Sequence, residues 1–209
     1  MRFIFSKIIL TLILTSTIIV VKAQKIYYSQ GNKYQKQVIS EDTAELIYSV
    51  YLIGDIKDPR PDNKVLKLLK HNIDKESSKS VVIILGDIVY PLGSPDSTDK
   101  GFVESEKDLN HILNTFDSFK GELIFLPGNH DWAKGKQQGW ESVKRQEIYI
   151  EQYNNRGNLY LPDEGCPGPV EVELSDDITL IVFDSQWWFQ KNEKPGIDED
   201  CDITNEAEL

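Results

Sequence analysis

Three apolar stretches of the chain each run into a glycine that is followed by a short polar residue. They are "YLIGD", "IILGD" and "FLPGN", and they place Asp55, Asp87 and Asn129 directly after the glycines. The stretches predict strands over residues 48–55, 80–87 and 122–128. The middle stretch is apolar at every position, which is typical of a parallel strand buried on both faces.

Helical patterns separate these strands. The segment after Pro61 predicts a helix whose apolar face is Val65, Leu68, Leu69 and Ile73, and a second helix carries Leu109, Ile112, Leu113 and Phe116. A third helix is expected from Gly139 to about Tyr153, and two alternating runs around Asp176-Asp177 predict a hairpin over 170–184. Strands and helices alternate every 30–40 residues or so, which indicates βαβ units and an α/β fold.

The three polar residues at the strand ends are expected to meet. The carboxyl ends of parallel strands form the ligand crevice of an open α/β sheet, and glycine lets the backbone turn tightly there. One Gly-Asp after a strand is usually a simple turn. Two carboxylates and an amide oxygen converging on one place are costly without a cation, so the pattern predicts a metal site at Asp55, Asp87 and Asn129.

The motifs "GD" (54–55), "GDIVY" (86–90) and "GNHD" (128–131) together resemble the calcineurin-like metallophosphoesterase family. The Gly-Asp-x-x-Tyr form is similar to its purple acid phosphatase branch. The stretches "GNHDW", "GCPGPVEVELSDD" and "FDSQWW" resemble exported bacterial envelope members of the superfamily. The resemblance covers residues 48–209 and implies a βαβ-type sandwich that hydrolyses phosphate esters at a dinuclear metal centre.

The resemblance also implies a ligand set. Asp55 and the phenolate of Tyr90 would bind the first metal, Asn129 would bind the second, and Asp87 would bridge the two. A phenolate ligand stabilises ferric iron, so the expected pair is iron with iron, zinc or manganese.

Two further residues of the third motif would serve catalysis. His130 would contact the substrate phosphate and protonate the leaving oxygen, and Asp131 would orient His130. Neither would bind a metal.

The sequence departs from the family pattern in two ways. Asp55 is followed by Ile56 and Lys57, where other members carry a histidine ligand or a glycine, so Lys57 either turns to solvent or reaches toward phosphate. The chain also has only three histidines, of which His71 and His111 fall on predicted helices. The histidine ligands of later family motifs are absent, so we expect this chain to be the N-terminal part of the domain (46–209), with a sandwich that is incomplete at its C-terminus. It would carry the first half of the site, and we expect it to be inactive by itself although its parent protein is an enzyme.

The N-terminus predicts export. Residues 1–23 combine Arg2 and Lys7 with an apolar run and small residues before Gln24, which is typical of a signal peptide; an uncleaved membrane anchor is the alternative. Residues 24–45 form a polar lead-in. Periplasm or outer cell envelope is the expected location, with membrane association possible through a region beyond this chain. Export permits a Cys166–Cys201 disulfide, and two free thiols are the alternative.

The acidic net charge argues against one class of function. A formal net charge of −11 argues against nucleic-acid binding, because such a surface repels phosphate backbones. Trp187 and Trp188 either line a substrate cleft or pack at its rim. Three interpretations remain: an exported phosphoesterase acting on phosphate esters, a degenerate phosphoesterase domain that serves as an envelope interaction module, and an unrelated α/β domain.

Overall fold

A computed structural model describes residues 47–153, 158–196 and 201. The chain divides into two compact units, Met1–Ala44 and Glu45–Leu209. The first unit holds the expected signal peptide and most of the lead-in, and it lies outside the described residues. Within the described residues, no helix is both long and apolar enough to cross a membrane.

The second unit is built on a parallel sheet of three strands. These are β1 (Ser49–Ile53), β2 (Ser80–Ile84) and β3 (Glu122–Phe125), in the spatial order β1-β2-β3. Both pairs are parallel, with Ile53 opposite Ile84 and Ile84 opposite Phe125. All five residues of β2 are buried, which explains why this strand is apolar throughout. The predicted α/β fold with parallel strands is confirmed.

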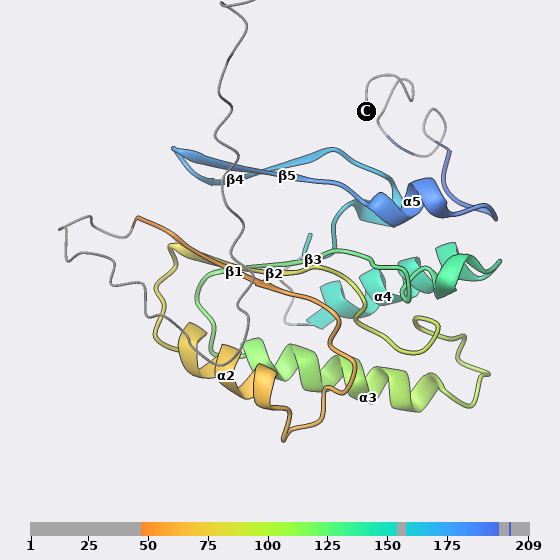
Figure 1. Ribbon diagram of the computed structural model, residues 1–209, viewed down its shortest axis with the longest axis horizontal. Helices are drawn as coiled ribbons and strands as arrows, with labels where there is room; N and C mark the ends of the chain where they lie inside the picture. Colours follow the sequence, from red (N-terminus) through yellow and green to blue (C-terminus); the bar gives the residue numbers. More distant parts are fainter. Residues whose placement is uncertain (1–46, 154–157, 197–200, 202–209) are drawn as a thin grey trace, which may run out of the picture. The chain divides into compact units, whose positions relative to one another are not determined.

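Three helices cover one face of this sheet. They are α2 (Lys64–Ile73), α3 (Phe102–Leu113) and α4 (Gly139–Gln152), and residues of all three join one buried cluster with Val82, Ile84 and Phe125 of the sheet. Figure 1 shows α2 and α3 on the same side of the strands. The predicted buried set of the second helix, from Leu109 to Phe116, is confirmed.

The predicted apolar face of the first helix is half wrong. Leu69 and Ile73 are buried as expected, but Val65 and Leu68 are 60% and 63% exposed, and Leu66 is buried in their place. Both stripes of this helix are apolar, so periodicity alone did not distinguish them. Packing against the sheet buries Leu66, and the side chain of Asn63 caps the helix by accepting hydrogen bonds from the amides of Val65 and Leu66.

The predicted hairpin is also present. β4 (Val170–Ser175) and β5 (Ile178–Val182) pair antiparallel, with a register shift between Glu173 and Ser175. Leu174 and Val182 pack on Val81 and Ile83, which point to the sheet face opposite the helices. Figure 1 accordingly shows the hairpin and the helices α2 and α3 on opposite sides of the sheet. A short helix, α5 (Ser185–Phe189), follows the hairpin.

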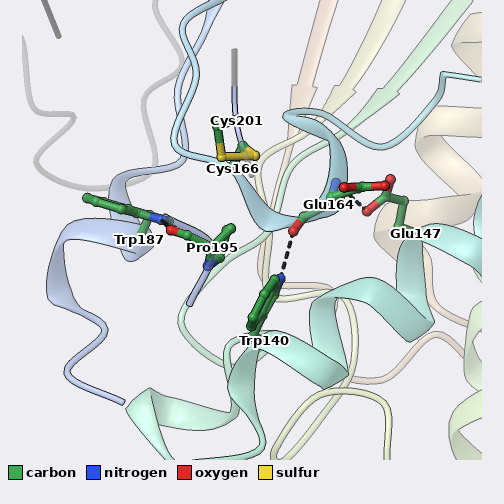
Figure 2. Close-up of a disulfide and its surroundings, with 7 residues drawn as sticks. All are labelled: Trp140, Glu147, Glu164, Cys166, Trp187, Pro195 and Cys201. Atoms are coloured by element: carbon green, nitrogen blue, oxygen red, sulfur yellow. Dashed lines mark hydrogen bonds between the residues drawn. A yellow bond between two sulfur atoms is a disulfide. The ribbon is translucent and has the colours of Figure 1, made fainter. Parts of the chain in front are cut away.

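The two cysteines form a disulfide. Cys166 and Cys201 are bonded, with their Cα atoms 5.9 Å apart (Figure 2). The bond ties the segment that precedes β4 to the end of the described chain. Of the two alternatives left open by the sequence, the structure has the bridge.

Candidate metal centre and active site

The ends of β1 and β2 are held side by side by backbone hydrogen bonds beyond the strands. The amide of Asp55 donates to the carbonyl of Gly86 (3.1 Å), and the amide of Ile56 donates to the carbonyl of Asp87 (3.2 Å). Both aspartates have a φ of 55°, which is uncommon for residues other than glycine. Such conformations cluster at functional sites, where surrounding contacts hold them in place.

Two glycines allow β2 and β3 to approach closely at this edge. Gly86 has a φ of +83°, and a Cβ atom on it would lie 2.5 Å from the amide nitrogen of Gly128. A Cβ atom on Gly128 would lie 2.4 Å from both the backbone nitrogen and Oδ1 of Asp87. No side chain fits at either position, so the glycines of the two motifs bring Asp87 and Asn129 together.

The amide group of Asn129 faces the carboxylate of Asp87, at 3.3 Å from Oδ1 and 3.1 Å from Oδ2. The side-chain amide of Asn129 can be turned in two ways. With its NH2 group toward Asp87, it donates hydrogen bonds to the carboxylate; with its oxygen toward Asp87, three oxygen atoms face one another, an arrangement that a cation stabilises.

Tyr90 completes the group of oxygen donors. Its hydroxyl donates to Oδ1 of Asp55, and its ring lies against the ring of His130, with centroids 4.1 Å apart and planes tilted by 43°. Burial and the hydrogen bond to Asp55 raise the pKa of the Tyr90 phenol. A phenolate here needs a neighbouring cation. The structure thus brings together Asp55, Asp87, Tyr90 and Asn129, and their carboxylate, phenol and amide oxygens suit a hard metal ion.

His130 is oriented by the backbone. Its ring nitrogen Nδ1 lies 2.8 Å from the carbonyl oxygen of Pro91, and its own amide donates to Oδ1 of Asp87 (2.8 Å). Because a carbonyl oxygen only accepts, Nδ1 carries the proton, and Nε2 of the neutral ring holds the lone pair.

The predicted role of Asp131 in orienting His130 is therefore wrong. Asp131 is fully buried, and its carboxylate accepts hydrogen bonds from four backbone amides: Asp87 (2.7 Å), Gly128 (2.8 Å), Ile88 and Val89 (both 3.1 Å). Burial raises the pKa of Asp131 to about 7, against the effect of these amides. The turns after β2 and β3 leave their amides without strand partners, and a buried carboxylate satisfies them together.

The sequence model of a family described as calcineurin-like phosphoesterase matches residues 48–199. The chain belongs to the calcineurin-like phosphoesterase family. The mixed α/β architecture with its parallel sheet is consistent with that fold, and membership indicates a phosphoester hydrolase, in a family that typically binds two metal ions. The match gives no support to the interaction-module interpretation. No curated protein and no solved structure matched the chain.

Lys57 lies beside the donor group of this phosphoesterase. Its Nζ is 5.9 Å from the centroid of the Tyr90 ring, and the side chain is exposed. Its amide donates to the carbonyl of Asp55 (2.9 Å), which keeps the residue next to the strand end. The structure thus places the lysine cation at the side of the site.

The loop after β3 is anchored to α5 by a pair that sequence patterns did not reveal. Trp132 is buried, and its Nε1 donates to Oδ2 of Asp184 (2.6 Å); Oδ1 of Asp184 accepts from the amide of Gln186 (2.7 Å) at the start of α5. Burial raises the pKa of Asp184 to about 7. The two residues are 52 positions apart, so only the folded chain brings them together.

Trp187 and Trp188, which the sequence analysis placed in a substrate cleft or at its rim, do not line the cavity beside His130. Trp187 is buried, with the Nζ atom of Lys194 3.6 Å from its ring centroid and its Nε1 donating to the carbonyl of Pro195 (3.2 Å; Figure 2). Trp188 is exposed. The aromatic residue of α5 that reaches the site is the next one, Phe189, which lines a cavity with His130.

A second acidic group lies on other elements. Oxygens of Glu147, Glu151 and Asp163 come within 4.8 Å of one another. Glu147 accepts a hydrogen bond from the amide of Glu164 (2.7 Å), whose carbonyl accepts from Nε1 of Trp140 (2.7 Å), as Figure 2 shows. Burial raises the pKa of Glu147 to about 7. These contacts attach the turn at Asp163–Gly165 to α4.

Proposed function

We propose that this domain hydrolyses phosphate esters at a dinuclear metal centre. The observation that carries the proposal is the convergence of four oxygen donors, Asp55, Asp87, Tyr90 and Asn129, at the ends of three adjacent strands. His130 adjoins them through its ring contact with Tyr90.

Each donor has a defined place in the proposal. Asp55 and Tyr90 would hold the first metal, because their oxygens already contact each other. Asn129 would hold the second, and Asp87, with two carboxylate oxygens beside Asn129, would serve both. The metal pair, when bound, supplies positive charge to phosphoryl oxygens and lowers the pKa of water.

His130 acts on the leaving group. The Nδ1–H group of His130 donates a hydrogen bond to the carbonyl oxygen of Pro91, so Nε2 is the ring nitrogen available to the ester oxygen. As the oxygen of a water molecule bonds to phosphorus and the ester phosphorus–oxygen bond breaks, the protonated imidazole donates its Nε2 proton to the leaving oxygen. The products are the neutral alcohol and phosphate. Asp131 has no direct part in this step. Its carboxylate accepts backbone hydrogen bonds in the turns that carry Asp87 and Asn129 and so positions these residues.

The experiment combines metal analysis with turnover of a generic aryl phosphate. In the purified protein that carries this domain, His130→Ala should slow turnover while metal content stays close to wild type, and Asp87→Asn should lower both. His71→Ala, on the exposed side of α2, is the matched control and should change neither. Loss of metal in His130→Ala, or full turnover in Asp87→Asn, contradicts the assignment.

Two features support a centre of the purple acid phosphatase type with iron and a second iron, zinc or manganese. Ile56 and Lys57 follow Asp55, so no histidine ligand stands there, and the Tyr90 hydroxyl contacts Asp55 in its place. An iron phenolate absorbs visible light. The protein should therefore show a visible band that Tyr90→Phe removes, and a colourless, fully active protein refutes this type.

Export is the remaining part of the proposal. The N-terminal 23 residues and the Cys166–Cys201 disulfide support an oxidising compartment, periplasm or outer envelope. Fractionation of cells and N-terminal sequencing test this: mature protein beginning at Gln24 outside the cytoplasm is expected. Full-length protein in the cytoplasm contradicts it.

A further inference from the structure

A cavity of about 420 Å³ opens directly beside His130. It lies between the loop after β3, which contributes Asn129, His130 and Lys134, and helix α5, which contributes Gln186 and Phe189. Its volume falls within the range of small-molecule sites, about 300–1,000 Å³.

The walls of this cavity are tied together. Besides the bond between Trp132 and Asp184, Nε2 of Gln190 donates to the carbonyl of Lys136 (3.2 Å) and Nδ2 of Asn192 donates to the carbonyl of Gly135 (2.6 Å). These contacts hold the residues on both sides of α5 against residues 132–136 of the loop. A cavity with fixed walls loses little order when a ligand enters, which favours binding.

The lining has a distinct chemistry. Phe189 is 72% exposed, so most of its ring surface is free to contact a ligand in the cavity. Lys134 adds a cation, and the cavity lining within the described part of the chain contains no carboxylate, although the whole chain has a net charge of −11. An aromatic ring carrying an anionic group fits such a lining, since rings stack on phenylalanine and the lysine attracts the charge.

The position of His130 indicates which part of a substrate would enter. Tyr90 lies against its ring, and Pro91 occupies Nδ1. A leaving oxygen that meets Nε2 must continue into space next to the imidazole, and this cavity adjoins His130. We propose that the cavity receives the leaving group of the ester, and that the preferred leaving group carries an aromatic ring that stacks on Phe189. The inference rests on the proposed phosphoesterase function.

Binding of two phosphonates tests this without turnover. Benzylphosphonate and ethylphosphonate share the charged group and differ by the ring, and neither is hydrolysed. Titration calorimetry on the metal-loaded protein that carries this domain should give a Kd about tenfold lower for benzylphosphonate. Phe189→Ala should bring the ratio of the two Kd values close to one, and Phe189→Leu should restore part of it.

Trp188→Ala provides the matched control. Trp188 is the neighbouring exposed aromatic residue on α5, 45% exposed, and it does not line this cavity. This variant should keep the wild-type ratio. Equal Kd values in the wild type, an unchanged ratio in Phe189→Ala, or no binding of either phosphonate overturns the proposal.

A second measurement separates this inference from the proposed function. Rates on benzyl phosphate and propyl phosphate compare esters of similar leaving-group acidity. Hydrolysis of both at equal kcat/KM refutes the aromatic pocket and leaves the phosphoesterase assignment standing. Selective binding of benzylphosphonate without hydrolysis of either ester supports the pocket and refutes the assignment.

Discussion

Replacement of Asp131 tests whether one buried carboxylate holds the active-site turns. In Asp131→Ala the four amides of Asp87, Ile88, Val89 and Gly128 lose their acceptor. Three of these amides belong to buried residues. An unsatisfied buried donor costs about 1–3 kcal/mol, so the three together cost at least about 3 kcal/mol.

Two effects adjust this figure. Water that enters the vacated space satisfies some of the amides, and removal of a buried acid relieves its desolvation, which is evident in a pKa raised to about 7. We expect a net loss of about 3 kcal/mol in the free energy of unfolding, at the upper end of single substitutions. Asp131→Asn keeps one oxygen acceptor and should lose about 2 kcal/mol.

Equilibrium unfolding in urea, with the disulfide intact, measures both losses. The midpoint should fall and the slope m should stay unchanged, because the same surface is exposed on unfolding. Asp177→Ala, at the exposed turn of the hairpin, is the control and should stay within about 0.5 kcal/mol of wild type. A loss below about 1 kcal/mol in Asp131→Ala refutes the argument that this carboxylate supports the turns.

Three further outcomes are expected. Burial raises the pKa of Glu147 from 4.5 to about 7, so its favourable contribution is complete below about pH 4.5 and is lost as pH rises through 7. Glu147→Gln should therefore gain about 2 kcal/mol relative to wild type between pH 4.5 and pH 8 in urea titrations, and an equal difference at both pH values contradicts this. The double variant Cys166→Ser, Cys201→Ser opens a loop with a sequence separation of 35 and should lower the free energy of unfolding by about 3 kcal/mol, whereas an unchanged midpoint argues against the loop-entropy account. Trp132→Phe removes a donor from the buried carboxylate of Asp184 and should cost about 2 kcal/mol by thermal unfolding; a melting temperature equal to wild type shows that the bond adds nothing.

The sequence by itself predicted the parallel strands and the residues at their ends. Each strand is a short apolar run stopped by glycine, and this is a local signal. Gly86 and Gly128 also indicated that the ends of two strands approach closely. In the structure, a Cβ atom on either glycine would collide with the backbone of the other strand end. Asp55, Asp87 and Asn129 could be placed together because parallel strands end at one edge.

Only the tertiary structure decided the partners of the other side chains. Helical periodicity allowed Val65 and Leu68 to face the core, yet packing on the sheet buries Leu66 instead. The carboxylate of Asp131 accepts hydrogen bonds from the amide of Gly128 and from three amides that lie 42–44 positions earlier in the chain, which no local pattern could indicate.

The wall of the cavity beside His130 also depends on a contact between residues far apart in the sequence. Trp187 is buried while Phe189 reaches the cavity, because Asp184 bonds to Trp132 and sets how α5 lies against the loop after β3. A sequence pattern reports which side chains favour burial or a turn. Which atoms they meet depends on segments far apart in the chain, and the folded arrangement alone brings those segments into contact.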